Sequence, residues 1–148
     1  MPRVVVMYGP NLNAVGTREP EHYGSQTLEE INDQIRTVAA SLKMDVEFFQ
    51  SNHEGALIDK LQEAGRTAQA IVLNPGGFGH TSVALRDAVA AVGIPVVECH
   101  LSNIAKREPF RHTTLTAPVC HGVIFGFGPD SMILGVRAAD AAIRAQGR

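Results

Sequence analysis

Five short hydrophobic segments recur along the chain, and polar residues or glycines follow each of them. They span residues 4–7, 46–49, 70–73, 96–99 and 122–125. Most are continuous runs rich in β-branched residues rather than strict alternations of polar and apolar positions. Such runs are typical of strands buried on both faces of a parallel sheet. The pattern therefore predicts five short, buried strands.

Helical patterns fill the stretches between most of these strands. Residues 27–30 (Thr-Leu-Glu-Glu) have the form of a capping box, and hydrophobic residues follow at helical spacing up to Leu42. Further helices are expected over residues 56–64, 81–92 and 132–145, the second of them ending before Gly93-Ile94-Pro95. Strands that alternate with helices predict βαβ units. We therefore expect a single domain over residues 1–148 with an α/β fold, a doubly wound five-stranded parallel sheet with helices on both faces.

Composition excludes several classes of protein. Thirteen Lys and Arg stand against 15 Asp and Glu, a net charge of −2 that supplies no basic field for a nucleic acid. Hydrophobic residues make up 45% and charged residues 19%, as in ordinary globular proteins. No apolar run approaches the ~20 residues of a membrane-spanning helix. The first residues resemble a strand rather than a signal peptide, and Cys99 and Cys120 form no CxxC pair. We therefore expect a reduced, cytoplasmic protein without a zinc site.

Polar side chains follow four of the five predicted strands. Ligands of parallel α/β sheets bind outside the carboxyl ends of the strands, where these side chains would gather. Asn and Gly are also the ordinary residues of turns and helix caps, but turn chemistry does not require histidine. The sequence thus predicts a site built from Asn11, Asn52, His53, Asn74, His80, His100 and Ser102.

The histidines differ in what their context supports. Glu98 lies two residues before His100, and positions i and i+2 of a strand face the same side. The carboxylate would therefore orient and charge the imidazole for general acid catalysis. His80 closes a glycine-rich segment before a helix, which suits ligand contact, whereas His53 fits catalysis and helix capping equally well. Surface or structural roles are expected for His22, His112 and His121.

Two loops are candidates for ligand contact. Residues 74–80 (NPGGFGH) match neither a phosphate-binding loop nor a dinucleotide fingerprint, so on spacing alone they are more simply a turn between a strand and a helix. Residues 11–26 form a long connection of the kind that often serves as a lid. This connection carries Arg18 and Tyr23, and an arginine beside a tyrosine would stabilise the phenolate as a base. The alternative is an exposed tyrosine without a role.

Several motifs together resemble one enzyme family. They are GPNLN at 9–13, REP at 18–20, YG at 23–24, QSNHEG at 50–55, HTS at 80–82, ECHLSN at 98–103 and REPFRH at 107–112. Their order and content are similar to those of type II 3-dehydroquinate dehydratases, from the first strand to the GFG at 126–128. The resemblance implies a flavodoxin-like fold and loss of water from 3-dehydroquinate to give 3-dehydroshikimate, a step shared by the shikimate pathway and quinate catabolism.

No residue cluster has metal-ligand spacing and no dinucleotide fingerprint is present, so we expect neither metal nor cofactor. The resemblance also implies catalytic roles. Tyr23 would take a proton from C2, and Arg18 would help keep it as phenolate. Asn11 would hold a water that steadies the enolate. His100 would protonate the departing C1 hydroxyl, with Glu98 orienting it.

Further roles implied by the resemblance concern binding and assembly. Arg111 would counter the substrate carboxylate. Asp87 would reach a neighbouring subunit's site, because the family assembles as trimers grouped into dodecamers. The other residues that would hold the substrate are Asn74, His80, Leu101 and Ser102.

Two alternatives to this mechanism follow from the residues. A lysine Schiff base is disfavoured because none of the three lysines (Lys43, Lys60 and Lys106) lies at a strand end. A non-catalytic flavodoxin-like module that binds a small anion or nucleotide would need neither Tyr23 nor His100. The chain departs from the family pattern at positions without an assigned role, namely Tyr8, Phe78, Cys99 and Ala105.

Overall fold

A five-stranded, fully parallel sheet forms the centre of the molecule, as the sequence predicts. The computed structural model describes residues 1–17 and 19–147, without the side chain of Tyr23. The strand order is β2-β1-β3-β4-β5. The strands are β1 (Arg3–Tyr8), β2 (Asp45–Gln50), β3 (Ala70–Asn74), β4 (Val96–His100) and β5 (Gly122–Phe125). All their carboxyl ends therefore meet at one edge of the sheet.

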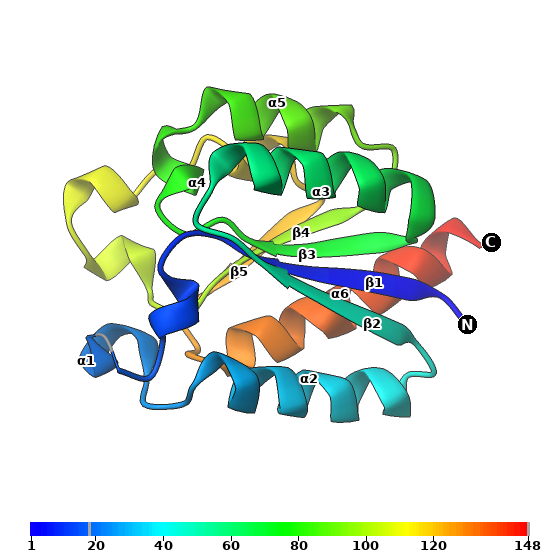
Figure 1. The fold of residues 1–148 in the computed structure, drawn as a ribbon, viewed down its shortest axis with the longest axis horizontal. Coiled ribbons are helices and arrows are strands. Elements are labelled where there is room, and N and C mark those ends of the chain that lie inside the picture. Colours follow the sequence, from blue (N-terminus) through cyan, green and yellow to red (C-terminus); the bar gives the residue numbers. More distant parts are fainter. Residues whose placement is uncertain (18, 148) are drawn as a thin grey trace.

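Helices cover both faces of the sheet (Figure 1). One layer holds α2 (Leu28–Ser41) and α6 (Asp130–Gln146), and the other holds α3 (Glu54–Thr67) and α5 (Val83–Ala91). Because side chains alternate along a strand, Val4 and Val6 pack into the core on one face, while Val5 and Met7 pack into the core on the other. The two cores make the central strands rigid supports for the loops beyond their carboxyl ends.

Short helical turns gather in those loops. They are η1 (Leu12–Ala14) and α1 (Pro20–Tyr23) after β1, α4 (Phe78–Thr81) after β3, and η2 (Ile104–Lys106), η3 (Pro109–Arg111) and η4 (Ala117–Val119) between β4 and β5. Figure 1 shows α1 beyond the carboxyl ends of the strands, on the side away from both chain termini. No helix in the described part of the chain is long and apolar enough to cross a membrane.

The structure corrects two local predictions. The helix expected over 81–92 is divided at Ser82, whose backbone is extended and whose hydroxyl accepts a hydrogen bond from the N–H of Leu85 at 2.9 Å. Ser82 therefore ends α4 and caps α5. Strands β2 and β5 are only partly buried, because they form the two edges of the sheet. The predicted capping box is confirmed, with Thr27 and Glu30 bonded reciprocally.

Candidate active site

A pocket lies at the carboxyl ends of β1, β3 and β4 and in the loops that follow them. Ile104 and Arg107 line it together with glycines of the β3 loop. Seven of the residues predicted from the sequence line the same pocket: Asn11, Asn74, His80, His100, Leu101, Ser102 and Arg111. The parallel topology thus brings together segments that are almost 100 residues apart in the chain.

His100 and Glu98 form a buried pair on β4. The Nε2 atom of His100 lies 2.9 Å from Oε2 of Glu98, whose side chain is wholly buried. A carboxylate can only accept, so Nε2–H of His100 donates to Glu98. Nδ1 is therefore the ring nitrogen that remains available to a bound molecule. The expected i, i+2 geometry is therefore present.

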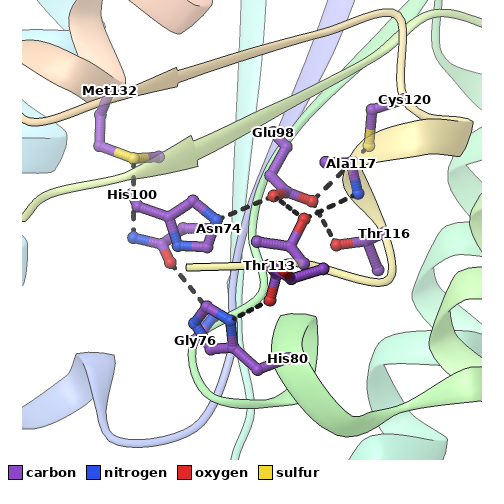
Figure 2. A network of polar contacts seen from close by, with 11 residues as sticks. Asn74, Gly76, His80, Glu98, His100, Thr113, Thr116, Ala117, Cys120 and Met132 are labelled. Atoms are coloured by element: carbon purple, nitrogen blue, oxygen red, sulfur yellow. Dashed lines mark hydrogen bonds and ion pairs between the residues drawn. The ribbon is translucent and has the colours of Figure 1, made fainter. Parts of the chain in front are cut away.

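Glu98 receives hydrogen bonds at both carboxylate oxygens (Figure 2). Thr114 Oγ1 donates to Oε2 at 2.9 Å, Thr116 Oγ1 donates to Oε1, and Cys120 Sγ lies 3.9 Å from Oε1. Burial alone would raise the pKa of the Glu98 carboxyl, but the hydrogen bonds from His100, Thr116 and Thr114 outweigh it and lower the pKa. Glu98 is therefore a fixed negative charge beside the imidazole.

His80 presents its ring against that of His100. The two ring centroids are 5.8 Å apart and the planes are inclined by 30°. His80 Nδ1 donates to the carbonyl oxygen of Thr113 at 2.9 Å, which leaves Nε2 as an acceptor in the neutral ring. Burial lowers the pKa of His80, and the nearby charges of His100 and Arg111 lower it further, against the opposing effects of Thr113 and Glu98. His80 is therefore a neutral polar contact near pH 7.

The loops after β1 and β3 pack closely at the pocket floor. Asn74 Oδ1 accepts a hydrogen bond from the N–H of Gly76 at 3.2 Å, and Gly76 has a positive φ of 59°. A Cβ at Gly9 would collide with the carbonyl oxygen of Pro75. Glycine is thus required for this approach, and residues 74–80 are a tight turn that positions Asn74 and His80.

Asn11 is braced by a second predicted residue. Its backbone is left-handed, with φ at 71°, and its N–H donates to Oδ1 of Asn52 at 2.9 Å. Gln50 Nε2 donates to the same oxygen at 3.1 Å. Asn52 therefore acts on the loop that carries Asn11 and is not among the residues lining the pocket.

Comparison with known proteins agrees with this geometry. The family model "Dehydroquinase class II" matches residues 2–140, nearly the whole chain. The chain belongs to the class II dehydroquinase family. The comparisons confirm the flavodoxin-like fold and the 3-dehydroquinate dehydratase activity that the resemblance predicts. They therefore argue against the alternative of a non-catalytic binding module.

Curated relatives of this dehydroquinase are similar over almost their full length. The "3-dehydroquinate dehydratase" of Acaryochloris marina (strain MBIC 11017) is 55% identical over 137 residues, 93% of this chain and 92% of that protein. The protein of the same name from Rhizobium meliloti (strain 1021) is 53% identical over 135 residues, 91% of each chain.

Solved structures of type II dehydroquinases superpose closely. The enzyme of Butyrivibrio crossotus DSM 2876 has a TM-score of 0.92 at 43% identity, covering 94% of this chain and 97% of that one. The enzyme of Propionibacterium acnes has the same TM-score at 30% identity, covering 95% and 97%. The match extends to the whole sheet and both helical layers.

Arg107 is a pocket residue of this dehydroquinase that sequence reasoning missed. Its side chain is only 5% exposed, and its Nη1 donates to Oγ of Ser102 at 3.3 Å. It also pairs with Glu19 and Glu108. A signal was available, since Arg107 stands four residues before Arg111 in the same motif, and both residues line the pocket.

Besides Asn52 and Glu98, which act on pocket residues from behind, four predicted residues are not among those that line the pocket. Asp87 is exposed on α5 and pairs with Arg86 at 3.0 Å, away from the residues that line the pocket. Arg18 and the side chain of Tyr23 lie outside the described residues, so their roles stay predictions. His53 is exposed and occupies the N-cap position of α3 without a side-chain capping bond. Among the residues described, no group of His, Cys, Asp and Glu could hold a metal ion.

Proposed function

We propose that this dehydroquinase removes water from 3-dehydroquinate through an enolate, with His100 as the general acid. The observation that carries the proposal is the buried pair of His100 and Glu98 in a pocket lined by Arg111. The pair supplies an oriented imidazole as proton donor, and the guanidinium supplies a partner for the substrate carboxylate.

The first step forms the enolate. A proton α to a ketone is acidic enough for a tuned oxygen base when the enolate is stabilised. Tyr23, as phenolate, takes the C2 proton, and Arg18 stabilises that phenolate. Asn11 holds a water that donates to the enolate oxygen. The motif resemblance supports the first two roles, and the position of Asn11 in the pocket wall supports the third.

The second step expels the C1 hydroxyl. The C1–O bond breaks as the enolate electrons form the double bond between C1 and C2, and His100 Nδ1 delivers the proton that makes the leaving group water. The Glu98 carboxylate stabilises the imidazolium before transfer. Tyr23 must then release its proton to solvent, and His100 must take one up. These two transfers restore both groups for the next turnover.

Substrate binding is divided among the remaining pocket residues. Arg111, whose side chain is 20% exposed and pairs with Glu108 at 3.0 Å, binds the substrate carboxylate without being fully desolvated. Neutral His80 and the amide of Asn74 suit ring hydroxyls, since each can form a directed hydrogen bond without adding charge. Leu101 and Ser102 complete the set.

The proposal extends to assembly and compartment. A trimer-based dodecamer would bring Asp87 of one subunit against the site of the next, a role supported by the family resemblance and by its exposed position on α5. The free cysteines Cys99 and Cys120 support a reducing compartment such as the cytoplasm.

A spectrophotometric assay tests the reaction. The chain, dialysed against a strong chelator, is mixed with 3-dehydroquinate and the absorbance of the conjugated enone product is followed. We expect product without added metal or nicotinamide, and loss of most of the rate in His100→Ala. The absence of product from the wild type would reject the reaction, and a rate that only metal restores would reject the mechanism.

A further inference from the structure

One segment outside the pocket is linked to both of its histidines. Residues 113–117, which we name the threonine strap, run between η3 and η4. The carbonyl oxygen of Thr113 accepts the bond from His80, and the hydroxyls of Thr114 and Thr116 donate to Glu98, which binds His100 (Figure 2). The strap thus reaches one imidazole directly and the other through a carboxylate.

The two hydroxyls are buried and lie behind Glu98. Thr116 is wholly buried and Thr114 is 7% exposed, and neither is among the residues that line the pocket. Their effect on chemistry must therefore pass through Glu98. Each hydroxyl has one hydrogen to give, and both give it to the carboxylate, one at each oxygen.

The strap is itself held in place. Thr114 Oγ1 accepts a hydrogen bond from the N–H of Ala117 at 2.9 Å, so this oxygen is held by the backbone while its hydrogen is donated to Glu98. The N–H of Leu115 donates to the carbonyl oxygen of Gly79 at 2.7 Å, beside His80 on α4. The strap, α4 and β4 are therefore connected by short hydrogen bonds.

We propose that Thr114 and Thr116 are positioning residues for the dehydration, clamping both oxygens of Glu98 so that His100 keeps one ring orientation and one tautomer. The inference rests on the proposed function for the role of His100 as the acid. A clamp of two donors opposes rotation of the carboxylate, so Oε2 remains aligned with Nε2 of His100. The two hydrogen bonds also stabilise the ionised form of Glu98, which burial by itself disfavours.

The charges around Glu98 decide the expected pH dependence. His100 and Cys99 lie on β4, Cys120 follows η4, His80 approaches from α4, and Arg111 acts on His80 from η3. Burial raises the pKa of Cys99 to about 12 and raises that of Cys120, so both thiols stay neutral. The threonine hydroxyls and His100 are therefore the groups that keep Glu98 ionised.

Thr116→Val tests the clamp, because it removes the hydroxyl with little change in volume. We expect kcat to fall about 10-fold or more while KM stays within about 2-fold, since a bond to a charged group is lost away from the bound substrate. The acid limb of the kcat profile should move to higher pH, because Glu98 then protonates more readily. Thr114→Val should act in the same direction, and Thr116→Ser should restore both kcat and the limb.

Thr37→Val is the control for the same substitution at an exposed position away from Glu98. Its hydroxyl donates to a backbone carbonyl of α2, so this variant should keep the wild-type rate and profile. A Thr116→Val enzyme with lower melting temperature but an unmoved acid limb, or one that Thr116→Ser fails to rescue, would overturn the clamp and leave the proposed reaction intact.

A second measurement separates the clamp from the reaction. A histidine N–H bonded to a carboxylate gives a strongly downfield proton resonance, which His100→Ala identifies by its absence. We expect Thr116→Val to broaden or shift this signal and Thr37→Val to leave it unchanged. An unchanged signal in Thr116→Val would reject the clamp whether or not the protein converts 3-dehydroquinate.

Discussion

His80 and His100 stack with their ring centroids 5.8 Å apart, yet different groups fix the two rings. His80 donates to a neutral carbonyl oxygen, that of Thr113, whereas His100 donates to the carboxylate of Glu98. The bond to Thr113 raises the pKa of His80, but burial outweighs it and keeps this ring neutral near pH 7. A carboxylate partner favours the charged form of an imidazole more strongly than a neutral carbonyl does. The contrast supports the proposed roles, substrate binding for His80 and proton donation for His100, within one stacked pair.

The proposed role of His100 as the general acid leads to a prediction for His100→Ala. Loss of the C1 hydroxyl should slow more than exchange of the C2 proton, because the proposed base is untouched. Deuterium exchange at C2, followed by NMR alongside product formation, measures both steps. His80→Ala is the comparison, and it should raise KM more than it slows either step. Equal slowing of exchange and elimination in His100→Ala would indicate a binding role instead.

Glu98→Gln should change the pH dependence of stability. The folded pKa of Glu98 lies below its ordinary value of 4.5, because hydrogen bonds outweigh burial. Glu98 therefore contributes stability that is present above about pH 4.5 and is lost as the pH falls through the folded pKa.

Urea unfolding at a series of acidic pH values and a fixed protein concentration checks this sign. The variant should lack part of the wild-type decrease in unfolding free energy below about pH 4.5. Glu29→Gln, at an exposed position on α2, should retain that decrease. Identical slopes for wild type and Glu98→Gln would show that the carboxyl is not held ionised by the fold.

Tyr23→Phe should fold and bind substrate but lose at least ~10²-fold in kcat, because only the proton-accepting oxygen is removed. The other tyrosine provides the control. Tyr8 donates to Oδ1 of Asn32 at 2.7 Å in the core, so Tyr8→Phe should keep its rate and lose about 1–3 kcal/mol of stability. A near-normal rate in Tyr23→Phe would reject Tyr23 as the base.

Asp87→Ala should lower activity or loosen the assembly without unfolding the subunit, if Asp87 acts across a subunit boundary. Light scattering on the wild type should give a mass many times 15.9 kDa. Asp33→Ala is matched, since Asp33 is as exposed as Asp87 and also pairs with a nearby arginine. A monomeric species with the full rate would reject a shared site.

Much of the fold could be predicted because its determinants are local. The short hydrophobic runs at 4–7, 70–73 and 96–99 were enough to identify the three central strands. The capping box of Thr27 and Glu30 marked the start of α2. The division at Ser82 was missed because the alanine- and valine-rich residues 83–91 follow Thr81 and Ser82 without a break in the sequence pattern. A serine hydroxyl caps a helix only when the backbone turns there, and tertiary packing decides that turn.

The sequence by itself determined which side chains would meet at the carboxyl edge of the sheet, since parallel strands leave no other place for Asn11, Asn74 and His100. It also determined the pairing of Glu98 with His100, which depends on a spacing of two residues on one strand. Only the tertiary structure decided how Glu98 is held. Thr114 and Thr116 lie 16 and 18 residues from it and reach it because the chain folds back between β4 and β5. Periodicity carries no information about such a contact, because the path of that loop is set by packing against α4 and the sheet.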